Sequence, residues 1–303
     1  MYDLIIIGAD SAGLSAGIYA GRKKLNAIIL TEKIGGQSLY AASIENYPGF
    51  LNISGVDLVS KLKEQVQKFG VSINDGEKVL SVKKDNDVFI VETKKNKYEA
   101  RAVIIATGSR WRALNIPGEN EFIGRGVSFC AICDAPFYFG KDVAVVGGGN
   151  SAFDSAYDLL KYANKIYLLQ RGEKFKGDEA MYNKLKKSGK VEFLTNAETK
   201  EIRGNKFVEK IIYEDKKTGQ TKELNVGGVF INIGQIPNSI FVEGFLELNE
   251  RKEIIIDCKS NAASVEGVFA AGDATNVKYK QAIIAAAEGA KAALSAYEYL
   301  VCQ

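Results

Sequence analysis

Two cysteines near the middle of the chain, Cys130 and Cys133, have the spacing of a redox pair. With two residues between them they can close a small disulfide that cycles readily between its dithiol and disulfide forms. Asp134 follows directly, where its carboxyl could supply or take up a proton as a thiolate leaves. A glycine-rich run, residues 147–152, comes shortly afterwards, between an apolar segment and a helix-forming one. A dithiol beside a dinucleotide site indicates that reducing equivalents pass from a carrier to sulfur.

The cysteine pair also has two simpler interpretations. It could be half of a zinc site, but zinc needs two more soft ligands, and only Cys258 and Cys302 remain, far apart in the sequence. It could also be a fortuitous buried pair, and Asp134 an acid at the start of a helix. We interpret Cys258 as a structural cysteine and Cys302 as a passive exposed thiol, and we predict no metal site.

The composition restricts the chemistry further. The chain has 303 residues and no histidine, which excludes Ser-His-Asp and Cys-His nucleophile systems and His-ligated metals. Proton transfer must therefore use a carboxylate, a thiol, a tyrosine, a lysine or water. The net charge of +3 is spread along the chain, so we expect no nucleic-acid partner. No apolar run reaches membrane-spanning length, and residues 1–7 lead straight into a strand, so we expect no membrane partner and a cytoplasmic location.

The elements that must position these residues form two similar strand–helix–strand units. Each unit begins with an apolar strand that ends in a glycine, Gly8 in the first and Gly147 in the second. The expected strand, helix and strand cover residues 2–7, 12–20 and 26–30 in the first unit, and 142–146, 151–161 and 165–169 in the second. The chain therefore reads as a doubling with one nucleotide in each half.

The rest of the pattern predicts how the two halves are connected. Further buried strands close in small-residue turns at 102–108, 228–234 and 267–273, and an alanine-rich helix covers about 281–300. The tail looks like a return to the first domain. We therefore predict an α/β fold with two Rossmann-like domains, the second inserted in the first: residues 1–113 and 243–303 form one domain, and 114–242 the other.

The second glycine run has the regular dinucleotide pattern. Gly147 makes the tight turn, Gly149 lets the backbone approach the pyrophosphate, and the small Ala152 lets helix and strand pack closely. A lone run of this kind can be merely a turn, but here a strand precedes it and a helix follows. Asn150 and Ser151 complete the expected nicotinamide-nucleotide site.

The segment after the next strand bears on the choice of coenzyme. A carboxylate there would hold the ribose of NAD, whereas basic residues would hold the phosphate of NADP. This chain has Gln170, Arg171 and Gly172, with Lys176 further on, and no acid directly after the strand. The segment could also be a solvated loop, so the signal for NADPH is slight.

The first glycine run, from Gly8 to Gly13, is irregular. Asp10 occupies the position of the second glycine, where it argues against a nucleotide in this half. Glu32 follows the next strand and is well placed for a ribose hydroxyl, although it could equally be an ordinary surface acid.

Taken together, the motifs resemble one known family over the whole chain. The chain resembles the low-molecular-weight thioredoxin reductases, and it is similar to the reductase module in the flavoprotein subunit of alkyl hydroperoxide reductase. The C-x-x-C-D pattern just before the second glycine run is nearly diagnostic. The motifs that carry the resemblance are Gly35-Gly36-Gln37, Glu45-Asn46-Tyr47-Pro48-Gly49, Ala106-Thr107-Gly108, Cys130 to Asp134, Gly147 to Ala152, and Gly267 to Asp273 followed by Tyr279-Lys280-Gln281-Ala282.

The resemblance implies FAD in the discontinuous domain, NADPH or NADH in the inserted one, and a homodimer. Cys133 would face the flavin, Cys130 would attack the partner's disulfide, and Asp134 would protonate the leaving thiolate. The residues expected at FAD are Gly8, Gly13, Glu32, Gly36, Gln37, Asn46, Thr107, Gly108, Gly272, Asp273, Gln281 and Ala282. Those expected at the nicotinamide nucleotide are Gly147, Gly149, Asn150, Ser151 and Arg171.

Two departures from the family concern the cofactors. The family usually has glycine or its equivalent where Asp10 stands. Members that use NADPH usually carry His-Arg-Arg and then a further Arg, which Gln170-Arg171-Gly172 and Lys176 match only in part.

We therefore interpret the chain as an FAD-dependent thioredoxin-disulfide reductase-like enzyme. Its acceptor would be thioredoxin or a thioredoxin-like or glutaredoxin-like protein, and a domain rotation is expected during turnover. The alternatives are the reductase of a peroxiredoxin system, a flavoprotein that takes electrons from another donor such as ferredoxin, and a non-catalytic redox sensor.

Overall fold

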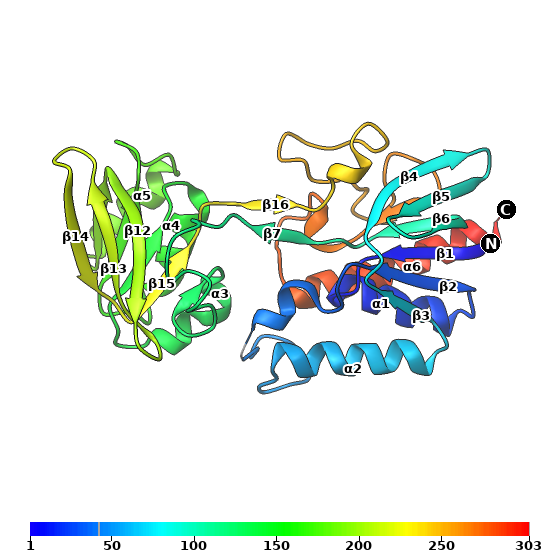
Figure 1. Cartoon of the computed structure of the whole chain (residues 1–303), viewed down its shortest axis with the longest axis horizontal. Helices are drawn as coiled ribbons and strands as arrows, with labels where there is room; N and C mark the ends of the chain where they lie inside the picture. Colours follow the sequence, from blue (N-terminus) through cyan, green and yellow to red (C-terminus); the bar gives the residue numbers. More distant parts are fainter. Residues whose placement is uncertain (42, 303) are drawn as a thin grey trace. The chain divides into compact units, whose positions relative to one another are not determined.

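The described residues, 1–41 and 43–302 of a computed structural model, form two compact α/β units. Residues 1–41, 43–110 and 236–302 make up the first unit, and residues 111–235 the second. The two segments that run between the units, β7 (Ser109–Trp111) and β16 (Gln235–Pro237), pair with each other (Figure 1). Parallel strands dominate the main sheet of each unit, which confirms the expected α/β class with two Rossmann-like folds.

The second crossing lies earlier than the expected 242/243. Residues 236–242 belong to the first unit, and they include the short helix η3 (Ile240–Val242). Val242 of that helix is fully buried in the same apolar cluster as Ile5 and Val268.

The sheet of the first unit has the order β3-β2-β1-β6-β5-β4, and β17 adds to β6. Ile5 at the centre of β1 pairs with Ile28 on one side and Val103 on the other, both in parallel register. β5 joins β6 antiparallel, as does β4 to β5. The strands are β1 (Tyr2–Ile7), β2 (Ala27–Thr31), β3 (Ser72–Asp75), β4 (Val79–Asp85), β5 (Val88–Thr93), β6 (Lys97–Ile105) and β17 (Val268–Ala270).

Helices α1 (Ser11–Arg22), α2 (Gly55–Lys68) and α6 (Ala282–Val301) cover one face of this sheet (Figure 1). The apolar strand β1 is buried on both faces, as a continuous run of Leu and Ile requires. α1 and α6 approach closely because both carry small residues. A Cβ at Gly289 would lie 2.0 Å from the carbonyl oxygen of Ala12, so only glycine fits there. Two further short helices, η1 (Gly36–Tyr40) and η4 (Gly272–Ala274), lie in loops of this unit.

The sheet of the second unit is parallel, in the order β11-β10-β9-β15-β8. Helices α3, α4, α5 and η2 contribute to the core on one face, and the antiparallel sheet β12-β13-β14 covers the other (Figure 1). The strands are β8 (Val127–Ser128), β9 (Val143–Val146), β10 (Ile166–Gln170), β11 (Val191–Thr195), β12 (Ala197–Gly204), β13 (Val208–Asp215), β14 (Gln220–Asn225) and β15 (Gly228–Ile231). The helices are α3 (Ala131–Asp134), η2 (Ala135–Tyr138), α4 (Asn150–Leu159) and α5 (Glu179–Lys187).

Candidate active site

The two central cysteines form a disulfide in the second unit. Cys130 caps the N-terminus of α3 and Cys133 lies within it, with the Cα atoms 5.3 Å apart. Both residues are half-buried. Helix α3 comes shortly after strand β8, which pairs in parallel with β15. The turn of helix thus holds the two sulfurs together while leaving them partly accessible.

Asp134 is the last residue of α3, and its carboxyl accepts a hydrogen bond from Ser128 in the preceding strand, β8. The hydroxyl of Ser128 donates a hydrogen bond of 2.6 Å to its Oδ2, and the same hydroxyl oxygen accepts the backbone N–H of Cys130 at 3.1 Å. Burial raises the pKa of Asp134 above its usual range, and the bond from Ser128 offsets this only in part. Such a carboxyl stays protonated to higher pH than an exposed one, which suits a group that exchanges a proton with a thiolate.

Tyr138 is the other titratable side chain that interacts with this carboxyl. It is buried in η2 and packs edge-on against Phe230, with ring centroids 4.9 Å apart. Its own burial raises the pKa of Tyr138 first, and the charge of Asp134 raises it further. Tyr138 therefore remains neutral and cannot replace Asp134 as an acid or base near neutral pH.

Two further cysteines bear on the zinc interpretation of the pair. Cys258 and Cys302 are both exposed thiols, so burial gives no support to a structural role for Cys258. Among residues 1–41 and 43–302, no cluster of three or more His, Cys, Asp or Glu side chains could hold a metal. The same part of the chain contains no helix long and apolar enough to span a bilayer.

The second glycine run forms the turn between β9 and α4. Gly147 has φ +150°, and a Cβ there would lie 2.3 Å from the carbonyl oxygen of Asn232. Gly149 precedes α4, and a Cβ on it would meet no heavy atom of the described residues within 4 Å. The turn is therefore compact, with open space at its second glycine and a helix N-terminus directly after it. These features fit a pyrophosphate.

Asn150 and Gln170 shape the surroundings of this turn. The side-chain oxygen of Asn150 accepts the backbone N–H of Asp178 at 2.7 Å, which ties the 177–178 loop to the start of α4. The side chain of Gln170 lies over Gly148 and donates to the carbonyl of Lys174. Ser151 is exposed in the first turn of α4.

Arg171 follows β10 directly and is exposed. Its charge acts on Glu198, whose pKa is lowered mainly by the hydrogen bond from Lys200 and only slightly by Arg171. A cation and an acid therefore both lie near the end of this strand, and their charges do not select one coenzyme.

The first glycine run forms the turn between β1 and α1. Gly8 has φ +110°, and a Cβ there would lie 2.2 Å from the carbonyl oxygen of Ala106. A Cβ at Gly13 would lie 1.9 Å from the carbonyl oxygen of Gly8. The turn is thus packed against the end of β6, as a dinucleotide fold requires. Thr107 beyond that end donates to the carbonyl of Asn238 at 2.7 Å, and Gly108 accepts the backbone N–H of Asn238.

Asp10 is the one residue of this turn that does not fit an incoming anion. It caps α1 by accepting the backbone N–H of Ser11 at 2.7 Å, and it accepts the hydroxyl of Ser38 at 2.6 Å. A Cβ at Gly36, where φ is +47°, would lie 2.8 Å from Asp10 Oδ2. Burial raises the pKa of Asp10 even though Ser38 and Ser11 hold it by hydrogen bonds. The carboxyl thus occupies donors that a phosphate would otherwise use.

Other residues expected at FAD come together in two contacts. Asn46 donates its side-chain amide to Gln281 Oε1 at 3.1 Å, just before Ala282 begins α6. Gln37 donates to the backbone carbonyl and hydroxyl of Ser109, and Ser109 in turn donates to Asp273. Burial raises the pKa of Asp273, with Asp10 among the weaker contributors.

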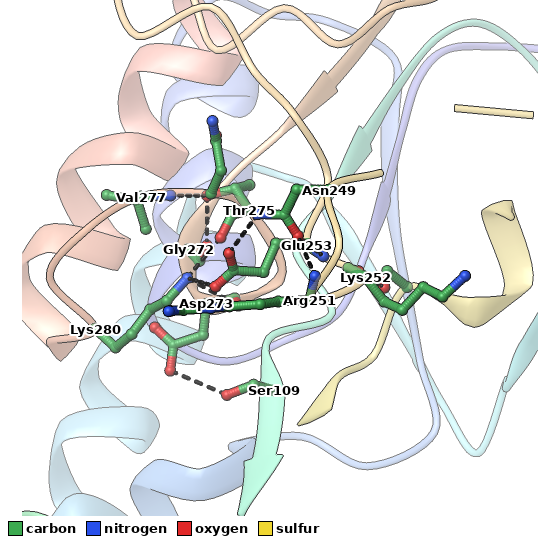
Figure 2. A network of polar contacts seen from close by, with 12 residues as sticks. Ser109, Asn249, Arg251, Lys252, Glu253, Gly272, Asp273, Thr275, Val277 and Lys280 are labelled. Atoms are coloured by element: carbon green, nitrogen blue, oxygen red, sulfur yellow. Dashed lines mark hydrogen bonds and ion pairs between the residues drawn. The ribbon is translucent and has the colours of Figure 1, made fainter. Parts of the chain in front are cut away.

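The loop that carries Asp273 and Gln281 is held by an ion pair (Figure 2). Lys280 Nζ lies 3.1 Å from Glu253 Oε1, and both side chains are largely buried, at 17% and 15% exposure. The same ammonium donates to the carbonyls of Asp273 and Thr275. Gly272 donates its N–H to Glu288 of α6 at 2.9 Å. Lys280 therefore ties both ends of the 272–281 loop to the 249–253 turn.

Glu32 lies apart from these contacts. It is exposed directly after β2 and forms an ion pair of 2.8 Å with Lys78. The acid at the end of β2 is thus paired with a surface lysine, and its role at a ribose hydroxyl stays a prediction.

Two dinucleotide-type folds in one chain, one of them carrying a disulfide, define the class of nicotinamide-dependent disulfide oxidoreductases. A family model described as pyridine nucleotide-disulphide oxidoreductase matches residues 2–289, and the chain belongs to this family. The family implies FAD and a pyridine nucleotide as cofactors.

Similar solved structures belong to thioredoxin reductases. That of Streptococcus pyogenes has a TM-score of 0.96 and 36% identity, covering 100% of this chain and 99% of that chain. That of Giardia duodenalis has a TM-score of 0.94 and 35% identity, covering 99% of both.

Curated relatives include longer proteins. A Bacillus subtilis protein named NADH dehydrogenase and a Staphylococcus aureus protein named as a subunit of alkyl hydroperoxide reductase are each 40% identical over 301 residues. Each alignment covers 99% of this chain and 59% of the relative. This chain therefore spans little more than half the length of those two proteins.

Sequence reasoning missed several residues of these sites. Ser128 and Asn238 hold the predicted site residues Asp134 and Thr107 by hydrogen bonds, whereas Ser38 contacts Asp10 and Glu253 contacts Lys280. Ser128 stands two positions before the cysteine motif, which was the only signal available for it. The other three are distant in sequence from the residues they contact.

Proposed function

We propose that the chain reduces the disulfide of a thioredoxin-like protein with electrons from NADPH or NADH. The single observation that carries this is the Cys130–Cys133 disulfide beside a carboxyl of raised pKa, in a unit that also has a dinucleotide turn. Bound FAD would supply the redox chemistry that links the nicotinamide to the disulfide.

The two redox cysteines, Asp134 and the two glycine turns each have a separate role. Reduction of the disulfide yields two thiols, and Cys130 acts as the nucleophile toward the acceptor while Cys133 closes the disulfide again. Asp134 exchanges the proton of the thiol that reacts, because it is the carboxyl that directly follows the pair. The turns at Gly8 and Gly147, with the helices after them, hold the two pyrophosphates.

The acceptor is a separate small redox protein in this proposal. Support comes from the likeness to thioredoxin reductases along the full length of those structures. The likeness to the alkyl hydroperoxide reductase protein of Staphylococcus aureus favours a second candidate, in which the acceptor belongs to a peroxiredoxin system and is thioredoxin-like or glutaredoxin-like.

We also propose that the protein is a homodimer. Apolar side chains are exposed on the segment before α2 and in its first turn, with Leu51 at 99% and Val56 at 58% exposure. Sedimentation of the wild type and of Leu51→Glu tests this: a dimer that the variant dissociates supports an interface here, and a monomeric wild type contradicts the proposal.

The central experiment is an anaerobic titration of the purified protein with NADH and with NADPH, following the flavin absorbance. Each reduced sample is then mixed with a thioredoxin disulfide. We expect the flavin to bleach and the disulfide to open. Cys130→Ser and Cys133→Ser should each keep the bleaching and abolish disulfide reduction.

Two results would contradict the proposal. One is full disulfide reductase activity in Cys130→Ser. The other is a flavin that neither nicotinamide reduces, since the electrons would then have to come from a different donor. Cys258→Ser is the matched control, because it removes an exposed thiol outside the pair.

A further inference from the structure

The hydroxyl of Ser128 contacts both the backbone of Cys130 and the carboxyl of Asp134. Ser128 is 4% exposed, at the end of β8, and its side chain has a single proton to donate. The shortest contact of its hydroxyl is the one to Asp134 Oδ2, at 2.6 Å. Its oxygen also accepts the N–H of Cys130 at 3.1 Å.

These contacts determine where the hydroxyl proton points. The other acceptor within reach is the carbonyl of Cys130, at 3.4 Å, a long contact to an oxygen that already accepts the N–H of Asp134. The N–H of Cys130 occupies the acceptor side of the hydroxyl. The proton is therefore directed to Asp134 Oδ2 rather than to the backbone.

A consequence follows for the protonated state of Asp134. A proton on Oδ2 would face the proton of Ser128 across 2.6 Å. When the carboxyl is protonated, its proton therefore lies on Oδ1, and Oδ2 remains an acceptor. Oδ2 of the carboxyl thus accepts the hydrogen bond from Ser128, whereas Oδ1 carries the proton.

We propose that Ser128 is a positioning residue that reserves Oδ2 of Asp134 and leaves Oδ1 to carry the proton exchanged with the redox thiols. This inference rests on the proposed function. Among the described residues, Ser128 of β8 donates a hydrogen bond to the carboxyl, and the titratable side chain of η2 that interacts with it is the neutral Tyr138.

Protons and electrons balance in the reaction. Asp134 takes the proton of the Cys130 thiol, and the thiolate attacks one sulfur of the acceptor disulfide, which breaks the acceptor S–S bond and forms a mixed disulfide. The departing thiolate takes the proton from Asp134. Cys133 then attacks the mixed disulfide, re-forms the Cys130–Cys133 bond and releases the second acceptor thiol with the remaining proton. The dithiol is oxidised and the acceptor disulfide is reduced by one electron pair.

The test uses the flavin-loaded protein reduced with dithiothreitol and freed of reagent, so that it does not depend on a nicotinamide. Wild type, Ser128→Ala and Ser128→Thr are each mixed with two disulfides across a range of pH. Hydroxyethyl disulfide has an alkyl leaving group that needs a proton. Dithiobis(nitrobenzoate) has an aryl leaving thiolate that is stable without one. Ser188→Ala is the matched control, because it removes a hydroxyl with a 2.6 Å hydrogen bond elsewhere in the same unit.

We expect Ser128→Ala to react about tenfold more slowly with hydroxyethyl disulfide, which is part of the effect that a positioned acid or base supplies. With the aryl disulfide the loss should be clearly smaller. The acid limb of the pH profile should move to higher pH, because the lost bond stabilised the carboxylate. Ser128→Thr should restore both the rate and the profile.

Three outcomes would overturn the inference: an unchanged pH profile in Ser128→Ala, an equal loss with both disulfides, or a threonine variant no better than alanine. The failure of the proposed function looks different. In that case the wild-type dithiol itself would not reduce hydroxyethyl disulfide at any pH.

Discussion

Asp10 and Ser38 are joined by a hydrogen bond of 2.6 Å from the hydroxyl to the carboxylate, and the backbone N–H of Ser38 reaches the second oxygen at 3.3 Å. This contact ties the N-terminus of α1 to η1, the helix that contains Gly36 and Gln37. The acid that replaces a glycine in the nucleotide turn is therefore part of the local structure as well as a charge near the expected pyrophosphate.

Asp10→Gly should bind FAD more tightly than the wild type. Two unit charges about 4 Å apart repel by roughly 1 kcal/mol in water and about 4 kcal/mol at an effective dielectric near 20. Removing the carboxylate should slow FAD dissociation and raise the flavin content of the purified protein. Loss of the N-cap should cost only a few tenths of a kcal/mol, since glycine is a tolerated cap. Flavin fluorescence on dilution measures the dissociation rate.

Asp10→Asn separates charge from bulk in the same experiment. Because burial raises the pKa of Asp10, its charge is lost at a higher pH than in a free carboxyl. Wild-type FAD affinity should therefore rise as the pH falls through that range, and Asp10→Asn should remove this part of the dependence. Asp273 and Glu288, whose pKa values burial also raises, contribute the remainder in both proteins. Identical pH profiles for the two proteins would show that the carboxylate does not oppose the phosphate.

Asp134→Asn should slow the thiol–disulfide steps about a hundredfold and leave hydride transfer to the flavin nearly unchanged. The amide keeps the size of the side chain but cannot exchange a proton. The sign of the wild-type pH dependence follows from the raised pKa of Asp134: the carboxylate form is lost already as the pH falls through that raised value. The acid limb of the wild-type profile should therefore be absent in the variant. Stopped-flow mixing of the dithiol with a disulfide measures it, and full turnover in Asp134→Asn would show that the carboxyl takes no part.

Lys280→Met should weaken FAD retention by loosening the 272–281 loop. The substitution leaves Glu253 without its ammonium partner and removes the donors to the carbonyls of Asp273 and Thr275. Breaking a buried pair on one side costs about 3–5 kcal/mol when the pair is fully buried, and less here because both side chains keep some exposure. Lys280→Arg keeps the charge and should retain most of the FAD. Thermal denaturation with and without added FAD compares the two, and equal FAD stabilisation in Lys280→Met and the wild type would contradict a role for the pair.

The parts of the molecule that the sequence predicts best are those that depend on local pattern. The turns at Gly8 and Gly147 need glycine for backbone reasons that the neighbouring strand and helix already indicate, and the structure shows both as tight turns. The antiparallel sheet of the second unit has no comparable signal. Its strand β14 is almost entirely exposed, so the sequence shows no apolar alternation there.

The site residues that escaped prediction depend on tertiary contacts. Ser128 bonds to Asp134 because a strand end meets a helix end, and Lys280 meets Glu253 across a loop. Neither the spacing of these residues in the sequence nor their residue types predict such pairs. Asp10 illustrates the opposite case: its departure from the glycine pattern was visible in the sequence, but its bonds to Ser38 were not.

Arg171→Ala tests the coenzyme preference, which the charges near the end of β10 leave modest. An Arg–phosphate contact at a partly exposed site contributes roughly 1–3 kcal/mol, and Arg171 is exposed, so the lower part of that range is expected. The wild type should favour NADPH slightly in the rate of flavin reduction, and Arg171→Ala should remove the preference by weakening NADPH alone. Lys187→Ala, which removes an exposed cation from the last turn of α5, is the control and should change neither coenzyme. Flavin reduction measured with both coenzymes at low and high salt completes the test, because a surface charge contact weakens as salt rises. Strong specificity of the wild type for NADH would show that Arg171 does not meet a phosphate, and that the acids near this strand end govern the choice instead.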